Sequence, residues 1–155
     1  DIFATAGPTL KLLGLDSAVS PFLNGERLQY LSLALNGLLF LAPMFYTWFD
    51  DALCGLTTPG TKTRLAERNA SVAFQVDSTV TSGIWEWTSV TGAGAWEAVG
   101  SPREFGPFAA QLGERLADQP DWTRATLQGR FRDLGMVAWR IRPVRLSGKQ
   151  SLPGV

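Results

Sequence analysis

The segment GLTTPGTKTR, residues 55–64, combines glycines, hydroxyl groups and one lysine within ten positions. Gly55 and Gly60 have the spacing of the phosphate-binding loop of nucleotide triphosphatases, but Thr61 stands between Gly60 and Lys62. A helix that begins at Thr61 would present free backbone N–H groups beside these side chains, and such groups bind phosphate. The segment therefore indicates either a phosphate site or an ordinary strand-to-helix turn with Lys62 in solvent.

The nucleotide triphosphatase interpretation fails on the elements that such a loop requires. That loop follows a strand of a parallel sheet, and an aspartate at the end of a second apolar strand completes it with magnesium. The segment VAFQVD ends in Asp77 and imitates that second strand, but Gln75 interrupts its apolar run. Because too few strand–helix units remain to build a parallel sheet, we reject this class.

The surrounding pattern predicts a mainly β domain whose strands follow one another directly. Apolar runs on both sides of Asn36-Gly37 predict an antiparallel hairpin, and Gly92 and Gly94 predict a bulge in a long strand. About six strands with helices outside them predict an antiparallel barrel or sandwich of the α+β class. As one domain over 1–155, the chain is expected to contain a helix at about 17–27, barrel strands within about 28–99 and 136–146, and a helical insert at about 105–133.

The composition excludes several classes of function. The 14 basic and 14 acidic residues leave no net charge, which argues against nucleic acid or a membrane as partner. There is no histidine, so triads that need it are excluded, and we expect no metal site. Cys54 is the single cysteine and is expected in a strand core, which suits a cytoplasmic protein. The apolar stretch at 31–45 is interrupted by Asn36 and Pro43 and is too broken to span a bilayer.

The order of segments within 28–99 resembles a known family. An apolar hairpin is followed by LAPMFYTWFDDALCGLTTPGTKTRLAERNASVAFQVD and then by WTSVTGAGAWEAV. This order is similar to that of the pyridoxamine 5'-phosphate oxidase-like flavin split-barrel superfamily. The resemblance implies an antiparallel split barrel of about six strands. It also implies a homodimer that holds flavin mononucleotide (FMN), or in some members a deazaflavin, at the subunit interface.

The resemblance also implies three groups of cofactor-binding residues. One group ends a strand and opens the next helix, where hydroxyls, free amides and a lysine would hold the flavin phosphate. A second group lies on the strand against the flavin ring, and a single polar residue lies on the long strand near the ring. The phosphate group is Leu56, Thr57, Thr58, Thr61 and Lys62; the ring strand contributes Pro43, Met44, Phe45 and Tyr46; the polar residue is Ser89.

Several aromatic and basic residues are weaker candidates. Each can serve the site in the family but is as readily explained by packing or by a solvated surface. They are Trp85 and Trp87 on one strand face, Trp139, Arg140 and Arg142 on the last strand, and Trp122, Arg130 and Arg132 on the late helix near a substrate entrance. True pyridoxamine phosphate oxidases carry basic residues near the positions of Leu41 and Tyr46, and their loss argues against that specific activity.

The leading hypothesis is an FMN-dependent oxidoreductase that transfers hydride through the flavin to or from a small organic substrate. No catalytic side chain is predicted, because the cofactor carries the chemistry and the protein positions it. A deazaflavin-dependent reductase is the first alternative, with Arg64 and Arg68 available for a longer anionic tail. A flavin-binding or sensing protein without turnover is the second, and a purely structural domain is the third.

Overall fold

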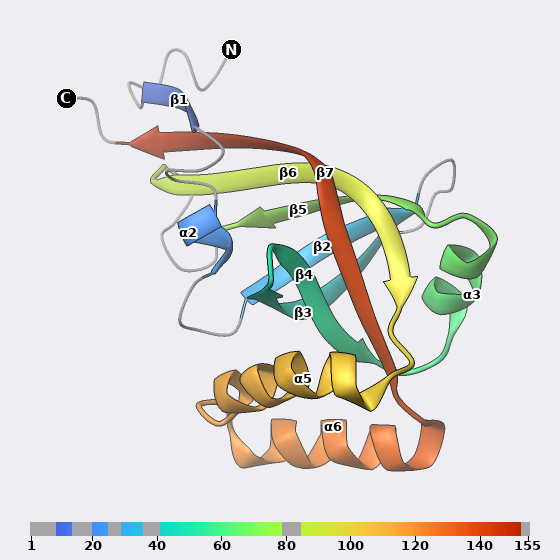
Figure 1. The fold of residues 1–155 in the computed structure, drawn as a ribbon. Coiled ribbons are helices and arrows are strands. Elements are labelled where there is room, and N and C mark those ends of the chain that lie inside the picture. Colours follow the sequence, from blue (N-terminus) through green and yellow to red (C-terminus); the bar gives the residue numbers. More distant parts are fainter. Residues whose placement is uncertain (1–8, 14–19, 25–28, 36–40, 79–84, 153–155) are drawn as a thin grey trace.

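A computed structural model of the chain describes residues 9–13, 20–24, 29–35, 41–78 and 85–152, which form a β-barrel with two long helices at one end (Figure 1). The strands are β1 Thr9–Leu13, β2 Gln29–Leu35, β3 Leu41–Phe49, β4 Ala52–Thr57, β5 Ser71–Asp77, β6 Trp87–Ala98 and β7 Val137–Leu152. The helices are α2 Ser20–Leu23, α3 Thr61–Arg68, α5 Pro102–Leu116 and α6 Asp121–Leu134.

Six of these strands close into a barrel. Their order is β7-β4-β3-β2-β5-β6, and pairing between β6 and β7 completes the ring. Each pairing between described strands is antiparallel. The predicted antiparallel split barrel with peripheral helices is therefore confirmed, and the described strands contain no parallel pair of the kind that a nucleotide triphosphatase loop requires.

Strand β7 closes the barrel and then continues beyond it. Its first residues pair with β4, where Val137 lies opposite Thr57, and its last residues pair with β1, where Leu152 lies opposite Thr9. The other edge of β7 pairs with β6 along almost its whole length. The last strand, predicted at about 136–146, instead continues to Leu152, because β1 and β6 offer backbone partners to both edges of the polar segment that follows.

Strands β2 and β3 form the hairpin predicted around Asn36-Gly37. Ala34 lies opposite Leu41 in an antiparallel register. The turn itself falls within residues 36–40, which lie outside the described residues. The N-terminal helix predicted at about 17–27 is described only as the single turn α2, and part of its predicted range lies outside the described residues.

The barrel interior is filled by side chains that alternate along the strands. In β5, Val72, Phe74 and Val76 are buried while the residues between them are exposed, as a strand with one face in the core requires. Trp139 of β7 is fully buried and stacks on Trp96 of β6, with ring centroids 5.0 Å apart. This pair packs the two strands that complete the barrel against each other.

Helix α5 is fixed to the corner where β3 meets β4. It buries Phe108 and Leu112. The Gln111 side-chain amide donates hydrogen bonds to the Thr47 hydroxyl and, at 2.9 Å, to the Trp48 carbonyl. Helix α5 therefore anchors this corner, and α6, which follows after a short turn, lies beside α5 at the same end of the barrel (Figure 1).

Two strand glycines lie where no side chain fits. At Gly94 a Cβ atom would come within 2.6 Å of the Arg142 carbonyl oxygen, and the register between β6 and β7 shifts there. The ladder is irregular where the glycines predicted it, but the extra residue, Val144, lies in β7 rather than in β6. At Gly55 a Cβ atom would lie 2.5 Å from a carbon of the Trp139 ring. The position of β4 beneath this ring therefore depends on a glycine.

We expect Gly55→Ala to lower the free energy of unfolding by about 1–3 kcal/mol, because the added methyl group displaces Trp139 from its packed position. Urea denaturation followed by circular dichroism measures this change. Gly100→Ala is the matched control, since no atom lies within 4 Å of the Cβ position there. Equal stability of Gly55→Ala and the wild type would contradict the packing of β4 against Trp139.

Candidate functional site

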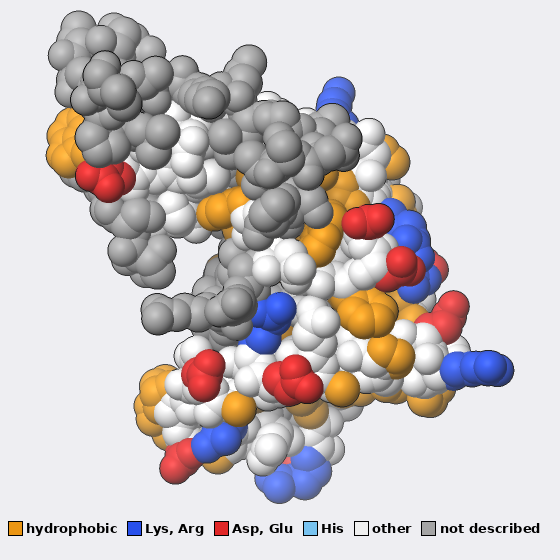
Figure 2. All heavy atoms as spheres, turned by 60° about the vertical axis from the view of Figure 1, so that its left-hand side comes forward, with side chains coloured by type: hydrophobic (Ala, Val, Ile, Leu, Met, Phe, Trp, Pro, Cys, Tyr) orange, Lys and Arg blue, Asp and Glu red, His pale blue; other side chains and the backbone are white. Residues whose placement is uncertain are grey.

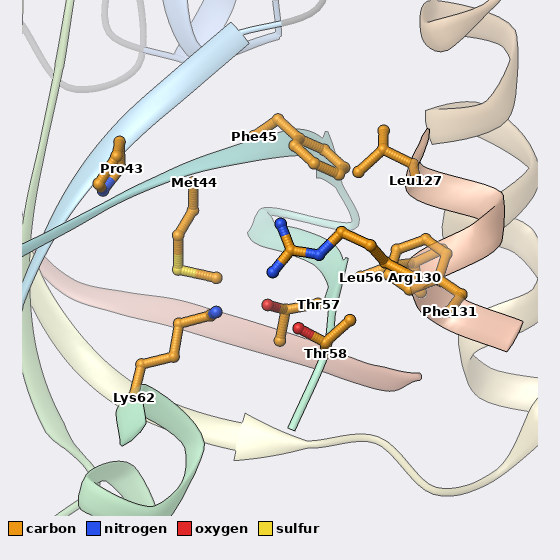
Figure 3. Close-up of a pocket in the computed structure, with 10 residues that line it drawn as sticks. All are labelled: Pro43, Met44, Phe45, Leu56, Thr57, Thr58, Lys62, Leu127, Arg130 and Phe131. Atoms are coloured by element: carbon orange, nitrogen blue, oxygen red, sulfur yellow. The ribbon is translucent and has the colours of Figure 1, made fainter. Parts of the chain in front are cut away.

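A recess opens where β3 and β4 separate. The two strands pair only from Thr47 to Phe49, so the earlier part of β3 is paired with β2 alone among the described strands. The edge of β3 that faces β4 therefore leaves backbone groups beside a cavity of about 160 Å³ (Figure 3). Its lining comes from β3, the end of β4, α3 and α6: Pro43, Met44, Phe45, Leu56, Thr57, Thr58, Lys62, Leu127, Arg130 and Phe131.

The turn between β4 and α3 places the hydroxyl groups and the lysine at this recess. Backbone pairing with β7 extends as far as Thr57, and the chain then turns at Pro59 and Gly60 into α3. The Thr63 hydroxyl accepts a hydrogen bond from the Gly60 N–H and donates one to the Gly60 carbonyl, each at 2.9 Å. Thr63 thus closes this turn, and Thr61 is the first residue of the helix, as predicted.

The first turn of α3 also has backbone N–H groups that find no carbonyl partner within the helix. The first backbone hydrogen bond of the helix runs from the Arg64 N–H to the Gly60 carbonyl, at 3.1 Å. The three N–H groups before Arg64 precede this bond and have no carbonyl partner within the helix. These N–H groups form the positive end of the helix dipole, in the same turn as Lys62.

Two cations reach the recess from different elements. Figure 3 shows Lys62 extending from α3 and Arg130 from α6 toward the part of the recess that Thr57 and Thr58 line. No aspartate or glutamate is among the described residues that line the recess, and no ion pair is found for either cation within the described ranges. Burial, and then the charge of Arg130, hold the pKa of the Lys62 amine below its ordinary value. This combination of charges and hydroxyls suits an anion.

The recess brings together most of the residues predicted to bind a cofactor. Those on its wall are Pro43, Met44, Phe45, Leu56, Thr57, Thr58 and Lys62. Tyr46 instead points into the barrel core, where its hydroxyl donates a hydrogen bond to the Leu23 carbonyl at 3.1 Å. Thr61 is exposed and accepts a bond from Arg64, and Ser89 lies in β6 outside the recess of a single chain. The cofactor roles of all ten residues stay predictions.

The sequence matches a family model over most of its length. The model described as pyridoxamine 5'-phosphate oxidase matches residues 16–150. The chain belongs to this family. The resemblance inferred from the order of its segments is therefore confirmed. A comparison with proteins of curated function found no significant match.

Solved structures with the same fold cover nearly the whole chain of this family member. A FAD-binding protein from Mesorhizobium loti has a TM-score of 0.70 at 22% identity, covering 94% of this chain and 99% of its own. A conserved hypothetical protein from Mycobacterium tuberculosis has a TM-score of 0.65 at 20% identity, covering 88% and 85%. A FAD and haem binding protein from Mycobacterium smegmatis has a TM-score of 0.62 at 17% identity, covering 91% and 73%. At these identities the likeness concerns the fold.

Three lining residues come from α6. Of these, the sequence analysis names only Arg130, as a candidate for a substrate entrance. Leu127, Arg130 and Phe131 follow the i, i+3, i+4 spacing of one helix face, which is the signal that would have grouped them. The other two entrance candidates do not line the recess. Trp122 is 72% exposed, and the Arg132 side chain pairs with Asp133.

A second cavity of this pyridoxamine 5'-phosphate oxidase family member lies between α5 and the corner of β3 and β4. Its volume is about 250 Å³. Arg140 is held by both carboxylate oxygens of Glu97, and Arg142 lies 3.8 Å from a carboxylate oxygen of Asp50. Burial raises the pKa of the Cys54 thiol to about 12, so this thiol is a core residue rather than a nucleophile. Both arginines here have a carboxylate partner, unlike the cations of the recess.

The described part of the chain has no other obvious centre for chemistry. Within it, no three His, Cys, Asp or Glu side chains gather in a way that suits a metal ion. None of its helices is long and apolar enough to cross a membrane. On the face shown in Figure 2, basic and acidic side chains are interspersed and do not form a patch of one sign. Neither Trp85 nor Trp87 lines the recess, which remains the best candidate site.

The lowered pKa of Lys62 predicts a stability gain when its charge is removed. Because the pKa is lower in the folded than in the unfolded protein, the cost of the charged amine is fully present below the folded pKa and fades as the pH rises through the unfolded value. At pH 7 we therefore expect Lys62→Met to raise the free energy of unfolding of the ligand-free protein. The gain should be a fraction of a kcal/mol, since the amine remains partly in solvent.

Urea denaturation at pH 7 measures this change. Arg68→Met removes an exposed cation from the same helix and should bring no such gain. A Lys62→Met protein less stable than the wild type would show that the lysine contributes to the fold rather than to a ligand site.

Proposed function

We propose that this protein is an FMN-dependent oxidoreductase that acts on a small organic substrate. The observation that carries the proposal is the convergence of Lys62 and Arg130 with the Thr57 and Thr58 hydroxyls, with no acidic side chain among the described lining residues. A phosphate monoester carries about two negative charges at neutral pH, so two cations match it. Hydroxyls and N–H groups at a helix start supply the hydrogen bonds that its oxygens accept.

The remainder of the recess suits the flavin ring. The free edge of β3 beside Pro43 and Met44 supplies backbone donors and acceptors for the polar side of the ring. Phe45, Leu127 and Phe131 supply apolar and aromatic surface, which is the usual composition of a cofactor site. The FAD-binding protein from Mesorhizobium loti and the FAD and haem binding protein from Mycobacterium smegmatis, which share the fold, support a flavin as ligand.

A bound flavin supplies hydride acceptance and donation at its ring. The task of this chain is then to hold the phosphate, to orient the ring against β3 and to exclude water from the reacting face. No titratable side chain other than the two cations is among the described lining residues, so no acid or base is assigned.

We further propose that a second copy of the chain completes the site. The recess of about 160 Å³ is smaller than the roughly 300–1,000 Å³ of pockets that bury a whole ligand. A flavin whose phosphate lies between Lys62 and Arg130 must therefore extend beyond the mouth of the recess. A homodimer with the cofactor at its interface would cover the exposed part, and Ser89 of β6 is a candidate contact from that second copy.

The deazaflavin alternative has less support from the site. Arg64 and Arg68, which are available for the longer anionic tail of a deazaflavin, do not line the recess. The Arg64 side chain instead donates a hydrogen bond to the Thr61 hydroxyl. A flavin sensor without turnover would have the same cofactor site. Sustained consumption of a reduced nicotinamide cofactor by the flavin-loaded protein separates an oxidoreductase from such a sensor.

The proposal predicts that the purified protein retains FMN through gel filtration and shows the flavin absorbance bands. Lys62→Ala should weaken FMN binding by about tenfold to a hundredfold, because it removes a charge-assisted hydrogen bond to the phosphate. Dissociation constants are measured from the change in flavin fluorescence on titration. Light scattering of the loaded protein reports whether it is a dimer.

Arg68→Ala is the control for a general loss of positive charge on α3, and it should bind FMN like the wild type. Retention of a deazaflavin but not of FMN would replace the proposed cofactor. Failure of the wild type to retain either ligand would overturn the proposed function.

A further inference from the structure

Helix α6 has little hydrophobic anchoring of its own. None of its residues is buried, and Trp122 and Leu134 are 72% and 57% exposed. Helix α5, by contrast, buries Phe108 and Leu112 against the barrel. Because most helices in proteins are stabilised by packing of an apolar face, α6 is held more weakly than α5.

Helix α6 is not continuous with the elements before and after it. Pro120 lies directly before its first residue, and proline does not continue the helix of α5. Gly135 follows its last residue with a φ of 89°, in the left-handed region that glycine adopts without strain. A change in the position of α6 therefore requires no break within α5 or β7.

The inner face of α6 directs a cation at the recess. Leu127, Arg130 and Phe131 all line the recess, where Leu127 lies next to Phe45 and Arg130 extends toward Thr57 (Figure 3). The same cavity contains Lys62, whose pKa is lowered in part by the charge of Arg130. Arg130 is exposed, so water screens this like-charge repulsion, but without an anion the part that remains opposes the seating of α6 against the barrel.

We propose that Arg130 is a second cationic ligand of the phosphate in the recess and that the bound phosphate holds α6 against the barrel. The proposal rests on the proposed function for the identity of the ligand. The phosphate turns the repulsion between Lys62 and Arg130 into two attractions, and it joins α3 to α6 through charge-assisted hydrogen bonds. Riboflavin has the same ring without the phosphate and leaves the repulsion in place.

Affinity measurements test the first half of the proposal. Arg130→Gln should weaken FMN binding by about tenfold to a hundredfold and should leave riboflavin binding nearly unchanged. Arg132→Gln is the matched control, because it removes the same charge from the same helix at a position outside the recess. Arg132→Gln should bind both ligands like the wild type.

Amide hydrogen exchange of residues 121–134 tests the second half and does not depend on activity. FMN should slow exchange in α6 of the wild type and of Arg132→Gln, whereas riboflavin should not. In Arg130→Gln, saturating FMN should leave α6 exchange close to the ligand-free rate. Exchange in β4 and β7 serves as an internal reference for the stability of the barrel.

The outcomes separate this inference from the proposed function. If the wild type binds FMN and Arg130→Gln binds it equally well, or if riboflavin protects α6 as FMN does, the inference is wrong and the flavin proposal stands. If the wild type binds no FMN, the exchange experiment is repeated with inorganic pyrophosphate. Protection of α6 in the wild type but not in Arg130→Gln would then support the inference with another phosphate ligand, and no protection would overturn it.

Discussion

The pairing of β7 with β4 determines where the barrel wall leaves a recess. Strand β4 is held by β7 as far as Thr57 opposite Val137, whereas β3 follows β4 only from Thr47 to Phe49. Helix α5 fastens this junction through the hydrogen bonds to Thr47. The gap between β3 and β4 is therefore a property of the barrel itself, while α3 and α6 complete its lining. The strand walls keep their geometry when no ligand is present.

The charges in this gap come from segments that meet only in the folded chain. Lys62 lies in the first turn of α3, shortly after the barrel strand β4. Arg130 belongs to α6, which lies between β6 and β7 in the sequence. Two cations without an acidic neighbour on the described wall disfavour the ligand-free fold. Functional sites in proteins are commonly less stable than they could be. Here the lowered pKa of Lys62 shows that its charged form is disfavoured in the fold.

Elements with a strong local pattern were predictable from the sequence. Examples are β5, in which buried and exposed residues alternate, and the group of Thr57, Thr58 and Lys62, which lies in one strand–turn–helix unit. The far half of β7 was not, because its polar residues lack alternation and its partner β1 lies at the other end of the chain. The side chain of Tyr46 lies in the core, where its hydroxyl bonds to the Leu23 carbonyl, a contact between distant segments that no local pattern specifies. The spacing of Leu127, Arg130 and Phe131 places them on one helix face, but which part of the barrel that face meets depends on tertiary packing.

The stacked indoles of Trp96 and Trp139 give the barrel an optical reporter of its own. They lie on β6 and β7, the two strands whose pairing completes the ring, and their planes are 17° apart at a centroid separation of 5.0 Å. Two indoles so close couple electronically, and the coupled signal in far-ultraviolet circular dichroism is lost when they separate. Opening of the barrel seam can thus be followed without a label, and a departure of α6 alone would leave that signal intact.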